Sequence, residues 1–328
     1  SYQMMSLPLY SGTFQEYDSW RDLGQELERL GCDGIEGVWG GEDLPKDLPA
    51  ELILGYHLIF YPDWLDFYRD DRAALKQKFG SLEAVASFYG GLGPDTLLEQ
   101  YRADLRRAVN LGARYVVFHV SDVSLEEGYT YRWLPTNQEV IDAAVEVVNL
   151  ILGEERWPFE FLVENQWWPG FTFTEPEETA RLLEGIRFAG KGILLDTGHL
   201  MNACTELKTE AEGADYIRSM LNRHGSLAKW VRGVHLHQSL SGAYVKAHTG
   251  SLPAGLPEDY MERFGVSYQH ILQIDQHRPW TDPAILPVLE QIEPRYLTHE
   301  LSSRGRMARA EAVSIQTRLL RQGGRMRV

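Results

Sequence analysis

Ten acidic and imidazole side chains lie at or just after the ends of short apolar runs, where a buried strand would meet a loop. They are His57, His119, Glu164, Asp196, His199, His235, His237, Asp275, His277 and Glu300. Mixed sets of histidine and carboxylate side chains bind divalent Zn, Mn, Co or Mg, and imidazole favours the transition metals. These residue types therefore predict a divalent-metal site, provided that the fold brings the strand ends together.

Three of the ten are carboxylates that end apolar runs: Glu164 follows FLV, Asp196 follows GILL, and Glu300 follows YLTH. A buried carboxylate is strongly destabilising unless it is paired or bound to a metal. Any one of the three could instead cap a helix or lie in an exposed loop. Occurring together at the ends of three strands, they favour a shared cation.

The spacing of the histidines gives further support to a metal site inside the barrel. His235 and His237 are two residues apart on one predicted strand, so their side chains point to the same side. Because the apolar residues beside them face the helices, both histidines are predicted to face the interior. The spacing does not say which of the two binds the metal. A simple hydrogen-bonding role is the alternative for the other histidines, and it applies best to His57 and His119.

Eight apolar runs alternate with helical segments along the chain. The runs are found in MSLPLY, DGIEGVW, ELILGYH, YVVFHV, FEFLVEN, KGILLD, VRGVHLH and RYLTHEL. Several lack clean alternation of polar and apolar residues, as expected for strands that are buried on both faces. The pattern predicts one domain over residues 1–328, an α/β fold of the closed parallel (β/α)8 TIM-barrel type, whose C-terminal mouth gathers the polar strand ends.

Local signals also predict helix boundaries. Residues 20–30 have helical spacing of apolar side chains and are followed by Gly31, which favours a left-handed helix end. Capping signals predict helix starts at Thr136 with Glu139, at Thr174 with Glu177, and at Asp282 before Pro283. The basic run from Arg304 to Arg327 predicts a final surface helix with cations at the favourable end of its dipole.

Two connections, about residues 58–94 and 238–280, are too long for simple crossovers. Both follow strand ends, so we expect them to cover the mouth of the barrel as lids or substrate-binding loops. Trp64 lies in the first insertion, and Trp167 and Trp168 lie in the loop after the fifth strand. Aromatic walls suit a small polyol or ring substrate, and they suit the packing of a lid on a barrel equally well. All three tryptophans are predicted substrate contacts.

Composition narrows the possible partners. The chain of 328 residues has a formal net charge of −15. Nucleic-acid binding depends largely on Lys and Arg neutralising phosphates, so this balance argues against a nucleic-acid partner. Cys32 and Cys204 are the only cysteines, which predicts two reduced, buried thiols in a cytoplasmic protein. No apolar run approaches the roughly 20 residues of a membrane helix, and SYQMMSLPLY lacks the pattern of a signal peptide.

The order of several motifs resembles a known superfamily. The motifs are EN (Glu164 and Asn165), DTGH (196–199), HLH (235–237), DQHRPW (275–280) and the final Glu300. Together they resemble the xylose isomerase-like TIM-barrel superfamily, and the similarity runs from the first strand to Glu300. That superfamily includes sugar-phosphate isomerases and epimerases and the endonuclease IV branch of DNA repair. The resemblance implies a divalent metal, and we expect no organic cofactor.

The resemblance also implies roles for single residues. Glu164, Asp196, His235 and Glu300 match the shared metal ligands, with His237 as the competitor of His235. His199, Asp275 and His277 resemble the ligands of an additional metal in the endonuclease IV branch, and His57 and His119 resemble the histidines that complete its three-metal cluster. Ketose epimerases usually place an arginine shortly after HLHQ, where this chain has Ser241 and Lys246. His237 and Lys246 are therefore added to the predicted substrate contacts.

Two enzymatic hypotheses follow, both with a small polar substrate. The favoured one is a metal-dependent sugar or sugar-phosphate isomerase or epimerase, in which Glu164 and Glu300 transfer the proton, His199 steadies a substrate oxygen, and the lid excludes water. The alternative is a phosphoester hydrolase with two or three metals, acting on a small molecule rather than DNA. A non-enzymatic binding barrel would have lost ligands, and this set is complete. A homo-oligomer is compatible with either hypothesis.

Overall fold

The computed structural model describes residues 1–324, in which eight parallel strands close into a barrel in sequence order, with the last strand paired to the first. The strands are β1 (Tyr2–Leu9), β2 (Gly34–Trp39), β3 (Ile53–His57), β4 (Tyr115–His119), β5 (Glu160–Glu164), β6 (Lys191–Asp196), β7 (Val231–Leu236) and β8 (Tyr296–His299). Each lies within one of the apolar runs identified in the sequence or overlaps it. The predicted (β/α)8 barrel is confirmed.

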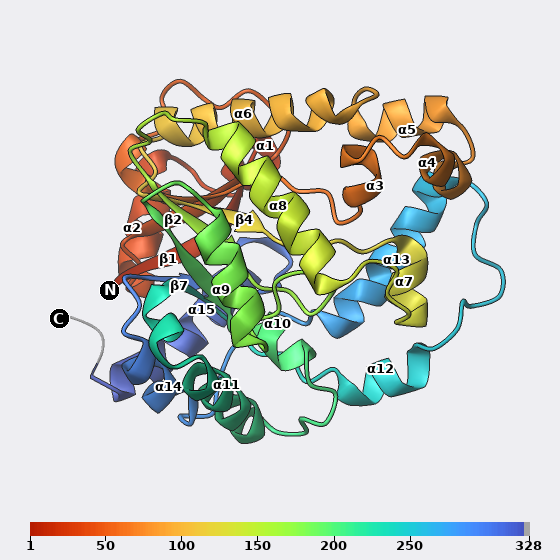
Figure 1. Cartoon of the computed structure of the whole chain (residues 1–328). Helices are drawn as coiled ribbons and strands as arrows, with labels where there is room; N and C mark the ends of the chain where they lie inside the picture. The colour runs from red at the N-terminus through yellow and green to blue at the C-terminus, as the bar shows by residue number, and fades with distance from the viewer. Residues whose placement is uncertain (325–328) are drawn as a thin grey trace.

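Helices surround the barrel, and further helices lie within its long loops (Figure 1). They are α1 (Ser11–Phe14), α2 (Trp20–Leu30), α3 (Leu65–Tyr68), α4 (Arg72–Phe79), α5 (Leu82–Tyr89), α6 (Pro94–Asn110), α7 (Leu125–Thr130), α8 (Asn137–Leu152), α9 (Pro176–Gly185), α10 (Thr197–Asn202), α11 (Glu210–His224), α12 (Gly242–His248), α13 (Tyr260–Ile274), α14 (Ile285–Ile292) and α15 (Gly305–Gln322), with 3-10 turns η1 (Ala50–Leu52) and η2 (Gly225–Trp230). None of the helices in residues 1–324 combines the length and the apolar character that a membrane crossing needs.

Two of the predicted helix ends are confirmed. Helix α2 ends at Gly31, whose φ of 75° is the left-handed value that glycine adopts without a Cβ penalty. Helix α8 begins with the predicted capping box, in which Thr136 and Glu139 satisfy each other's backbone N–H groups. These signals depend on a few neighbouring residues, which is why the sequence alone located them.

Two other predicted caps are wrong. Helix α9 begins at Pro176 with Glu175 at its N-cap, and the Thr174 hydroxyl instead pairs with that of Thr172 at 2.7 Å. Helix α14 begins at Ile285, two residues after Pro283, although the Asp282 carboxylate does accept a hydrogen bond from the Ala284 N–H at 2.9 Å. In both places the helix begins later than the spacing of the capping residues predicts.

The C-terminal prediction holds as far as the structure describes it. Helix α15 covers residues 305–322, and Arg321 lies in its last turn, where the helix dipole favours a cation. Arg306 contacts Asp22 at 2.6 Å and so ties the start of α15 to α2. Arg327, at the end of the predicted helix, lies outside the described residues.

The interior of the barrel is filled below the strand ends that carry the polar residues. A buried cluster inside it contains Met4, Leu54, Tyr115, Val117, Leu162, Leu194 and Tyr296. Tyr115 reaches across from β4, and a Cβ on Gly55 would lie 2.2 Å from its ring, so that glycine creates the room for it. The packed interior forms a rigid floor for the polar residues above.

The two long insertions pack against each other. The first contains α3 to α5, the second contains α12 and α13, and these helices lie together on the side of the molecule away from the N-terminus (Figure 1). The rings of Phe79 and Tyr260 stack at 3.8 Å, and Arg263 donates to the Lys78 carbonyl at 2.7 Å. His270 of α13 also contacts the Gly128 carbonyl at 2.8 Å, which joins α7 to the same assembly. Both insertions contribute residues to the pocket above the mouth, where the sequence predicted a cover.

A buried ion pair holds the first insertion together. The Lys78 ammonium lies 2.8 Å from Asp63 and 2.7 Å from Asp66. We expect Lys78→Met to lower the free energy of unfolding by about 3 kcal/mol, because removing one partner leaves a buried carboxylate uncompensated. Urea unfolding would measure the loss. The double variant Lys78→Met/Asp63→Asn should recover most of it, and equal losses in the single and double variants would contradict the explanation.

Both cysteines are free thiols. Cys32 is buried as predicted, but Cys204 is partly exposed, so the prediction of two buried thiols is wrong for Cys204. Cys204 lies in the loop that follows the short helix α10, where its side chain is partly exposed.

Candidate metal centre

The predicted ligands meet at the C-terminal mouth because of the strand register. Glu164 ends β5 and pairs with His119 at the end of β4, while Asp196 ends β6 and pairs with His235 of β7. Glu300 directly follows β8. Glu164, Asp196 and His235 are fully buried, with 0% exposure. The ten side chains form three contiguous groups of potential ligands.

The first group, called the strand group, comprises Glu164, Asp196, His235 and Glu300. His235 Nδ1 lies 2.9 Å from Glu164 Oε1, 2.7 Å from Glu300 Oε2 and 3.6 Å from Asp196 Oδ2. Three carboxylates thus surround one imidazole nitrogen in a buried space. This is the set that the family resemblance implied, and it identifies His235 as the histidine of this group.

The second group, called the histidine-pair group, comprises His57, His119 and Glu164. His119 Nε2 lies 3.0 Å from Glu164 Oε2, and His57 Nε2 lies 3.1 Å from His119 Nε2 and 3.7 Å from Glu164 Oε1. Both histidines therefore present their Nε2 atoms to one carboxylate. This arrangement is compatible with the predicted metal ligation and with the hydrogen-bonding role that the sequence left as the alternative.

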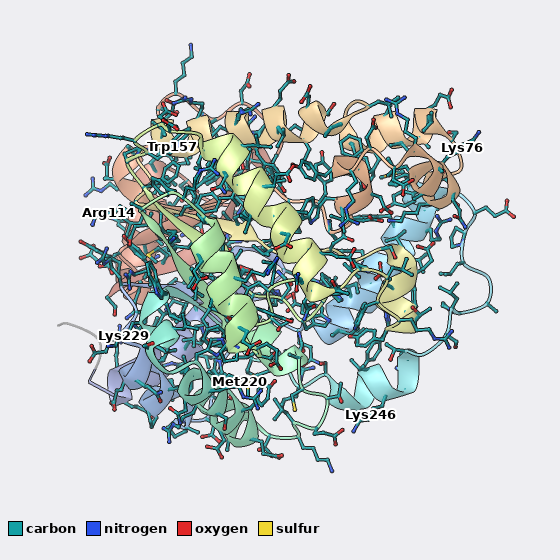
Figure 2. All side chains as sticks on the ribbon, in the orientation of Figure 1. Lys76, Arg114, Trp157, Met220, Lys229 and Lys246 are labelled. Atoms are coloured by element: carbon teal, nitrogen blue, oxygen red, sulfur yellow. The ribbon has the colours of Figure 1, made fainter. Side chains whose placement is uncertain are left out.

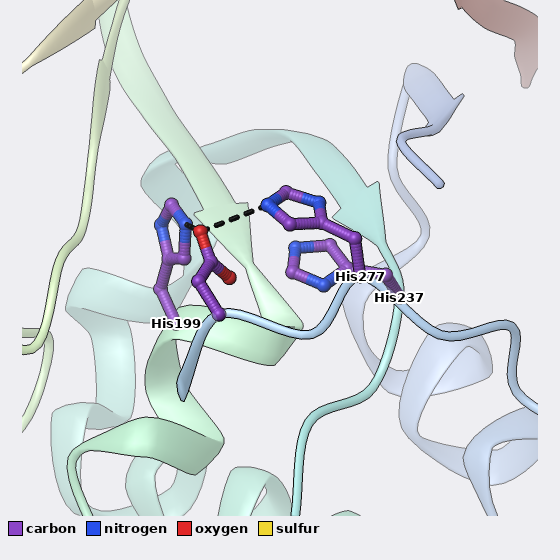
Figure 3. A group of neighbouring side chains, drawn as sticks. His199, His237 and His277 are labelled. Atoms are coloured by element: carbon purple, nitrogen blue, oxygen red, sulfur yellow. Dashed lines mark hydrogen bonds and ion pairs between the residues drawn. The ribbon is translucent and has the colours of Figure 1, made fainter. Parts of the chain in front are cut away.

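The third group, called the loop group, comprises His199, His237, Asp275 and His277. Asp275 Oδ2 lies 3.2 Å from His199 Nε2 and 2.8 Å from His277 Nε2. The rings of His237 and His277 stack at 4.1 Å, with His199 on the other side of the group (Figure 3). His277 has a φ of 49°, a strained backbone value for a non-glycine residue. Such strain of about 1–3 kcal/mol is typical of functional sites.

Two carboxylates connect the groups into one centre. Glu164 belongs to both the strand group and the histidine-pair group. Asp196 Oδ1 lies 2.7 Å from His237 Nε2 of the loop group, and its Oδ2 faces His235 of the strand group. The three groups are therefore neighbours, with Glu164 and Asp196 between them.

The unpartnered atoms of the centre fit bound cations. Among residues 1–324, several buried atoms of the predicted ligands have no hydrogen-bond partner although other polar atoms lie close. They are both carboxylate oxygens of Glu164, Oδ2 of Asp196, Oδ1 of Asp275, Oε2 of Glu300, Nδ1 of His235 and both ring nitrogens of His237. A buried polar group without a partner costs about 1–3 kcal/mol. Divalent cations would satisfy these atoms, and histidine with carboxylate is a suitable donor set for them.

Three of the histidines form a hydrogen bond on the side of the ring away from the centre, and this bond determines which ring nitrogen faces the centre. His57 Nδ1 lies 2.8 Å from the Leu58 carbonyl oxygen. His199 Nδ1 lies 2.9 Å from that of Asn165, and His277 Nδ1 lies 3.0 Å from that of Glu300. A carbonyl only accepts, so each Nδ1 carries the proton and each Nε2 of the neutral ring keeps its lone pair toward the centre. Such outer contacts are typical of metal-binding histidines.

His235 is oriented by a residue that the sequence analysis missed. Its Nε2–H donates to Glu36 Oε1 at 2.7 Å, so the lone pair of the neutral ring is on Nδ1, among the three carboxylates. Glu36 Oε2 accepts from Tyr115 and Thr298 at 2.5 and 2.7 Å. The only local signal was an acid within the apolar run DGIEGVW, and nothing in that run reveals its partner on β7.

We expect Glu36→Gln to weaken metal binding by the strand group about 10–100-fold, the usual cost of losing an outer contact to a ligand. The amide keeps the shape, but it removes the charge that makes His235 a better ligand. Competition with a metal indicator would measure the affinity. Glu42→Gln, an exposed acid just after β2, is the matched control and should leave the affinity unchanged. Equal affinities in all three proteins would contradict the role of Glu36.

Burial and neighbouring charges shift the pKa values of the centre in opposite directions. Burial alone would lower the pKa of His277, but Asp275 and Glu300 beside it raise that pKa to about 10. Burial alone would raise the pKa of Glu300, but His235 and His277 lower it to about 2. The carboxylates therefore stay ionised at neutral pH. Without a cation, neighbouring carboxylates raise the pKa of His199, His235 and His277, and these rings hold protons in its place, whereas burial lowers the pKa of His119.

A cavity of about 320 Å³ lies above the centre. Its lining includes the ligands His57, His119, His199, Asp275, His277 and Glu300. The predicted substrate contacts Trp64, Trp167 and Trp168 also line it, and the Trp64 Nε1–H donates to the Ser121 carbonyl at 2.6 Å. The structure therefore brings the aromatic residues of two separate loops to one cavity.

Two predicted substrate contacts lie elsewhere. Lys246 is on the outer helix α12 at the edge of the molecule, paired with Glu206 at 2.9 Å (Figure 2). His237 is fully buried within the loop group and does not line the cavity. The sequence placed both near HLHQ but could not show that the chain turns away from the mouth before Lys246.

Comparisons with known proteins agree with this architecture. Residues 25–293 match the family described as xylose isomerase-like TIM barrel. Endonuclease IV from Thermus thermophilus is 16% identical over 98% of this chain and 100% of its own, with a TM-score of 0.51. A D-tagatose 3-epimerase-like protein is 14% identical over 99% and 98%, with a TM-score of 0.53. The IolI protein, crystallised with a zinc atom, is 16% identical over 98% of each chain, with a TM-score of 0.50. At these identities the solved structures establish the fold. Among curated proteins, none matches significantly.

Proposed function

The chain belongs to the xylose isomerase-like TIM-barrel family, and we propose that it is a multinuclear metal enzyme that hydrolyses small phosphoesters. The family includes sugar isomerases and epimerases as well as endonuclease IV-like enzymes. The geometry of the ligand groups favours the hydrolytic side of that range, whereas the sequence alone favoured an isomerase.

One observation carries the proposal: the predicted ligands form three neighbouring groups, two of which share Glu164, while Asp196 of the strand group contacts His237 of the loop group. The two oxygens of Glu164 contact histidines of different groups, at 3.0 Å for His119 and 2.9 Å for His235. An isomerase that chelates two substrate oxygens needs one such group. Closely spaced metal sites are typical of phosphatases and nucleases, in which they hold both the attacking and the leaving oxygen of a phosphoryl group.

The residues of the centre have separate roles in this proposal. Bound divalent cations would supply Lewis acidity and would lower the pKa of water toward neutrality. Glu164 and Asp196 hold the groups together from below, out of contact with the cavity. Glu300 lines the cavity and is ionised at neutral pH, because His235 and His277 lower its pKa, and in this proposal its carboxylate accepts the proton of an attacking water molecule. The lid formed by the two insertions limits access of bulk water.

The isomerase remains the second candidate, because Glu300 lines the cavity and epimerases share the fold. In that mechanism Glu164 and Glu300 would face the substrate from two sides. Glu164, however, is fully buried, does not line the cavity, and has both oxygens directed at histidines. Its position supports a bridging ligand more than a proton carrier.

Elemental analysis and substrate assays would test the proposal together. We expect about three divalent metals per chain, one for each ligand group, and release of phosphate from small phosphoesters by the loaded protein. Duplex DNA should be a poor substrate, given the net charge of −15. A single metal per chain, with exchange of a carbon-bound sugar proton for deuterium and no phosphate release, would overturn the hydrolase in favour of the isomerase.

A further inference from the structure

The cavity above the metal centre has two unlike surfaces. Its floor is formed by histidine and carboxylate ligands, whereas its walls are largely aromatic and aliphatic, including Phe60, Trp64, Trp168, Phe264, Ile271 and Leu272. Among the described residues that line the cavity, neither Lys nor Arg occurs. A site for a sugar or polyol would need polar side chains to replace the water around each hydroxyl, since unpaired polar groups are costly to bury. Polar side chains such as Ser124, Gln166 and Ser267 also line the cavity, but most of its exposed surface is apolar.

Aromatic rings flank the ligands on two sides. The Phe60 ring lies 4.1 Å from the His119 ring and 5.7 Å from the His57 ring. Across the mouth, the Trp167 ring lies 5.3 Å from His199 and 4.2 Å from Trp168. A molecule bound to the centre therefore has apolar surfaces directly beside the charged floor.

Trp168 lines the cavity and carries a buried polar atom. It is 8% exposed, and its buried indole N–H has no hydrogen-bond partner among the described residues. An unpaired buried donor is destabilising on its own.

We propose that the substrate is a phosphoester whose alcohol portion is an apolar group, either an aromatic ring or a short hydrocarbon chain, which occupies this cavity while the phosphate faces the ligand floor. This inference rests on the proposed hydrolytic function and names its substrate class. The histidine and carboxylate side chains of the floor would hold divalent cations, which would supply the positive charge for the phosphate in place of Lys or Arg. Water supplies the oxygen that forms the new P–O bond, and the ester P–O bond breaks so that the apolar alcohol leaves with a proton.

The apolar class makes a quantitative prediction. Burial of each methylene is worth about 0.8 kcal/mol, which corresponds to about a fourfold change in affinity. Alkylphosphonates from methyl to hexyl, which resist hydrolysis, should therefore bind the metal-loaded protein about fourfold more tightly for each added carbon until the cavity is full. Isothermal titration calorimetry would measure the series. Glycerol phosphate, which is polar and of similar size, should bind more weakly than propylphosphonate.

Two variants assign the effect to the cavity walls. Phe60→Ala and Ile271→Ala should each flatten the dependence on chain length and weaken hexylphosphonate binding about tenfold, with methylphosphonate little changed. Phe60 is 44% exposed, so its loss leaves the packed core intact. Leu134→Ala is the matched control, because Leu134 is 80% exposed and does not line the cavity, and it should bind the series as the unaltered protein does.

The outcomes separate the two proposals. Binding that is independent of chain length, or glycerol phosphate binding as tightly as propylphosphonate, would overturn the apolar class even if phosphate is released from polar esters. A steep chain-length dependence without phosphate release from the matching alkyl phosphates would support the apolar cavity and overturn the hydrolytic function.

Discussion

Glu164→Gln will leave the protein folded but remove most of its bound metal and lower its turnover by at least about 10³-fold. Glu164 is the residue shared by the strand group and the histidine-pair group, and its two oxygens lie 2.9 Å from His235 Nδ1 and 3.0 Å from His119 Nε2. Glutamine has the same shape but offers one neutral oxygen, so two neighbouring cation positions lose a charged ligand. Metal ions supply several kcal/mol of transition-state stabilisation, and each 1.4 kcal/mol is tenfold in rate.

The loop group shares no ligand with Glu164, so the variant should retain about one metal of three. Elemental analysis of the purified variant, together with phosphate release, would check both numbers. Glu160→Gln is a matched control at the other end of the same strand, where Glu160 contacts Arg295 at 3.0 Å. It should keep full metal content and turnover. Wild-type metal content in Glu164→Gln would show that the shared carboxylate does not hold the centre together.

Chelation of the metals will lower the melting temperature by about 10 °C or more, and the loss will grow as pH rises. A cation that is saturating at a hundred times its Kd contributes about 2.7 kcal/mol, so the three expected cations contribute about 8 kcal/mol, and each kcal/mol shifts the melting temperature of a chain this size by about 2 °C. Removing the cations also leaves buried carboxylates facing each other. Protons on the histidines are then the only remaining compensation.

The direction of the pH effect follows from the histidines. In the metal-free protein, Asp275 and Glu300 outweigh burial and raise the pKa of His277 to about 10, and neighbouring carboxylates likewise raise the pKa of His199 and His235. A raised folded-state pKa stabilises the protein fully below the unfolded value near 6.5, and that stabilisation is lost as pH rises toward about 10. Metal binding displaces these protons, so metal affinity rises over the same range.

Melting curves at pH 6, 7.5 and 9, with and without a chelator, would measure this gap. We expect the smallest difference at pH 6 and the largest at pH 9, with full recovery when a divalent metal is returned. In Glu164→Gln the gap should be smaller at every pH. A gap that stays constant or shrinks with rising pH would contradict the exchange of protons for cations on these histidines.

Much of the fold was predictable from the sequence because its signals are local. Each strand is a compact apolar run, and each helix end that was predicted correctly, such as Gly31 and the Thr136 capping box, depends on residues within one turn. The predictions failed where contacts between distant parts of the chain, rather than neighbouring residues, determined the local structure. Thr174 has the spacing of a cap, but the chain enters α9 at Pro176 by another path. Lys246 follows HLHQ closely, but helix α12 carries it to the surface.

The sequence could not determine which of His235 and His237 joins the strand group, whereas the tertiary structure does. Two histidines that point inward from one strand are equivalent by spacing. In the closed barrel, His235 pairs in register with Asp196 and meets Glu36 behind it, while His237 lies past the strand end beside His277. Glu36 itself was invisible to sequence reasoning, because a partner 199 residues away exists only after the barrel closes.

The sequence by itself determined the number of strands and the position of ten histidine and carboxylate side chains at or near the strand ends, since these depend on residue type and on neighbours along the chain. The tertiary structure alone decided how the ten predicted ligands divide into three neighbouring groups and which rings line the cavity above them. The physical reason is that grouping depends on register, on closure between β8 and β1, and on the packing of two insertions against each other, all of which join residues far apart in the chain.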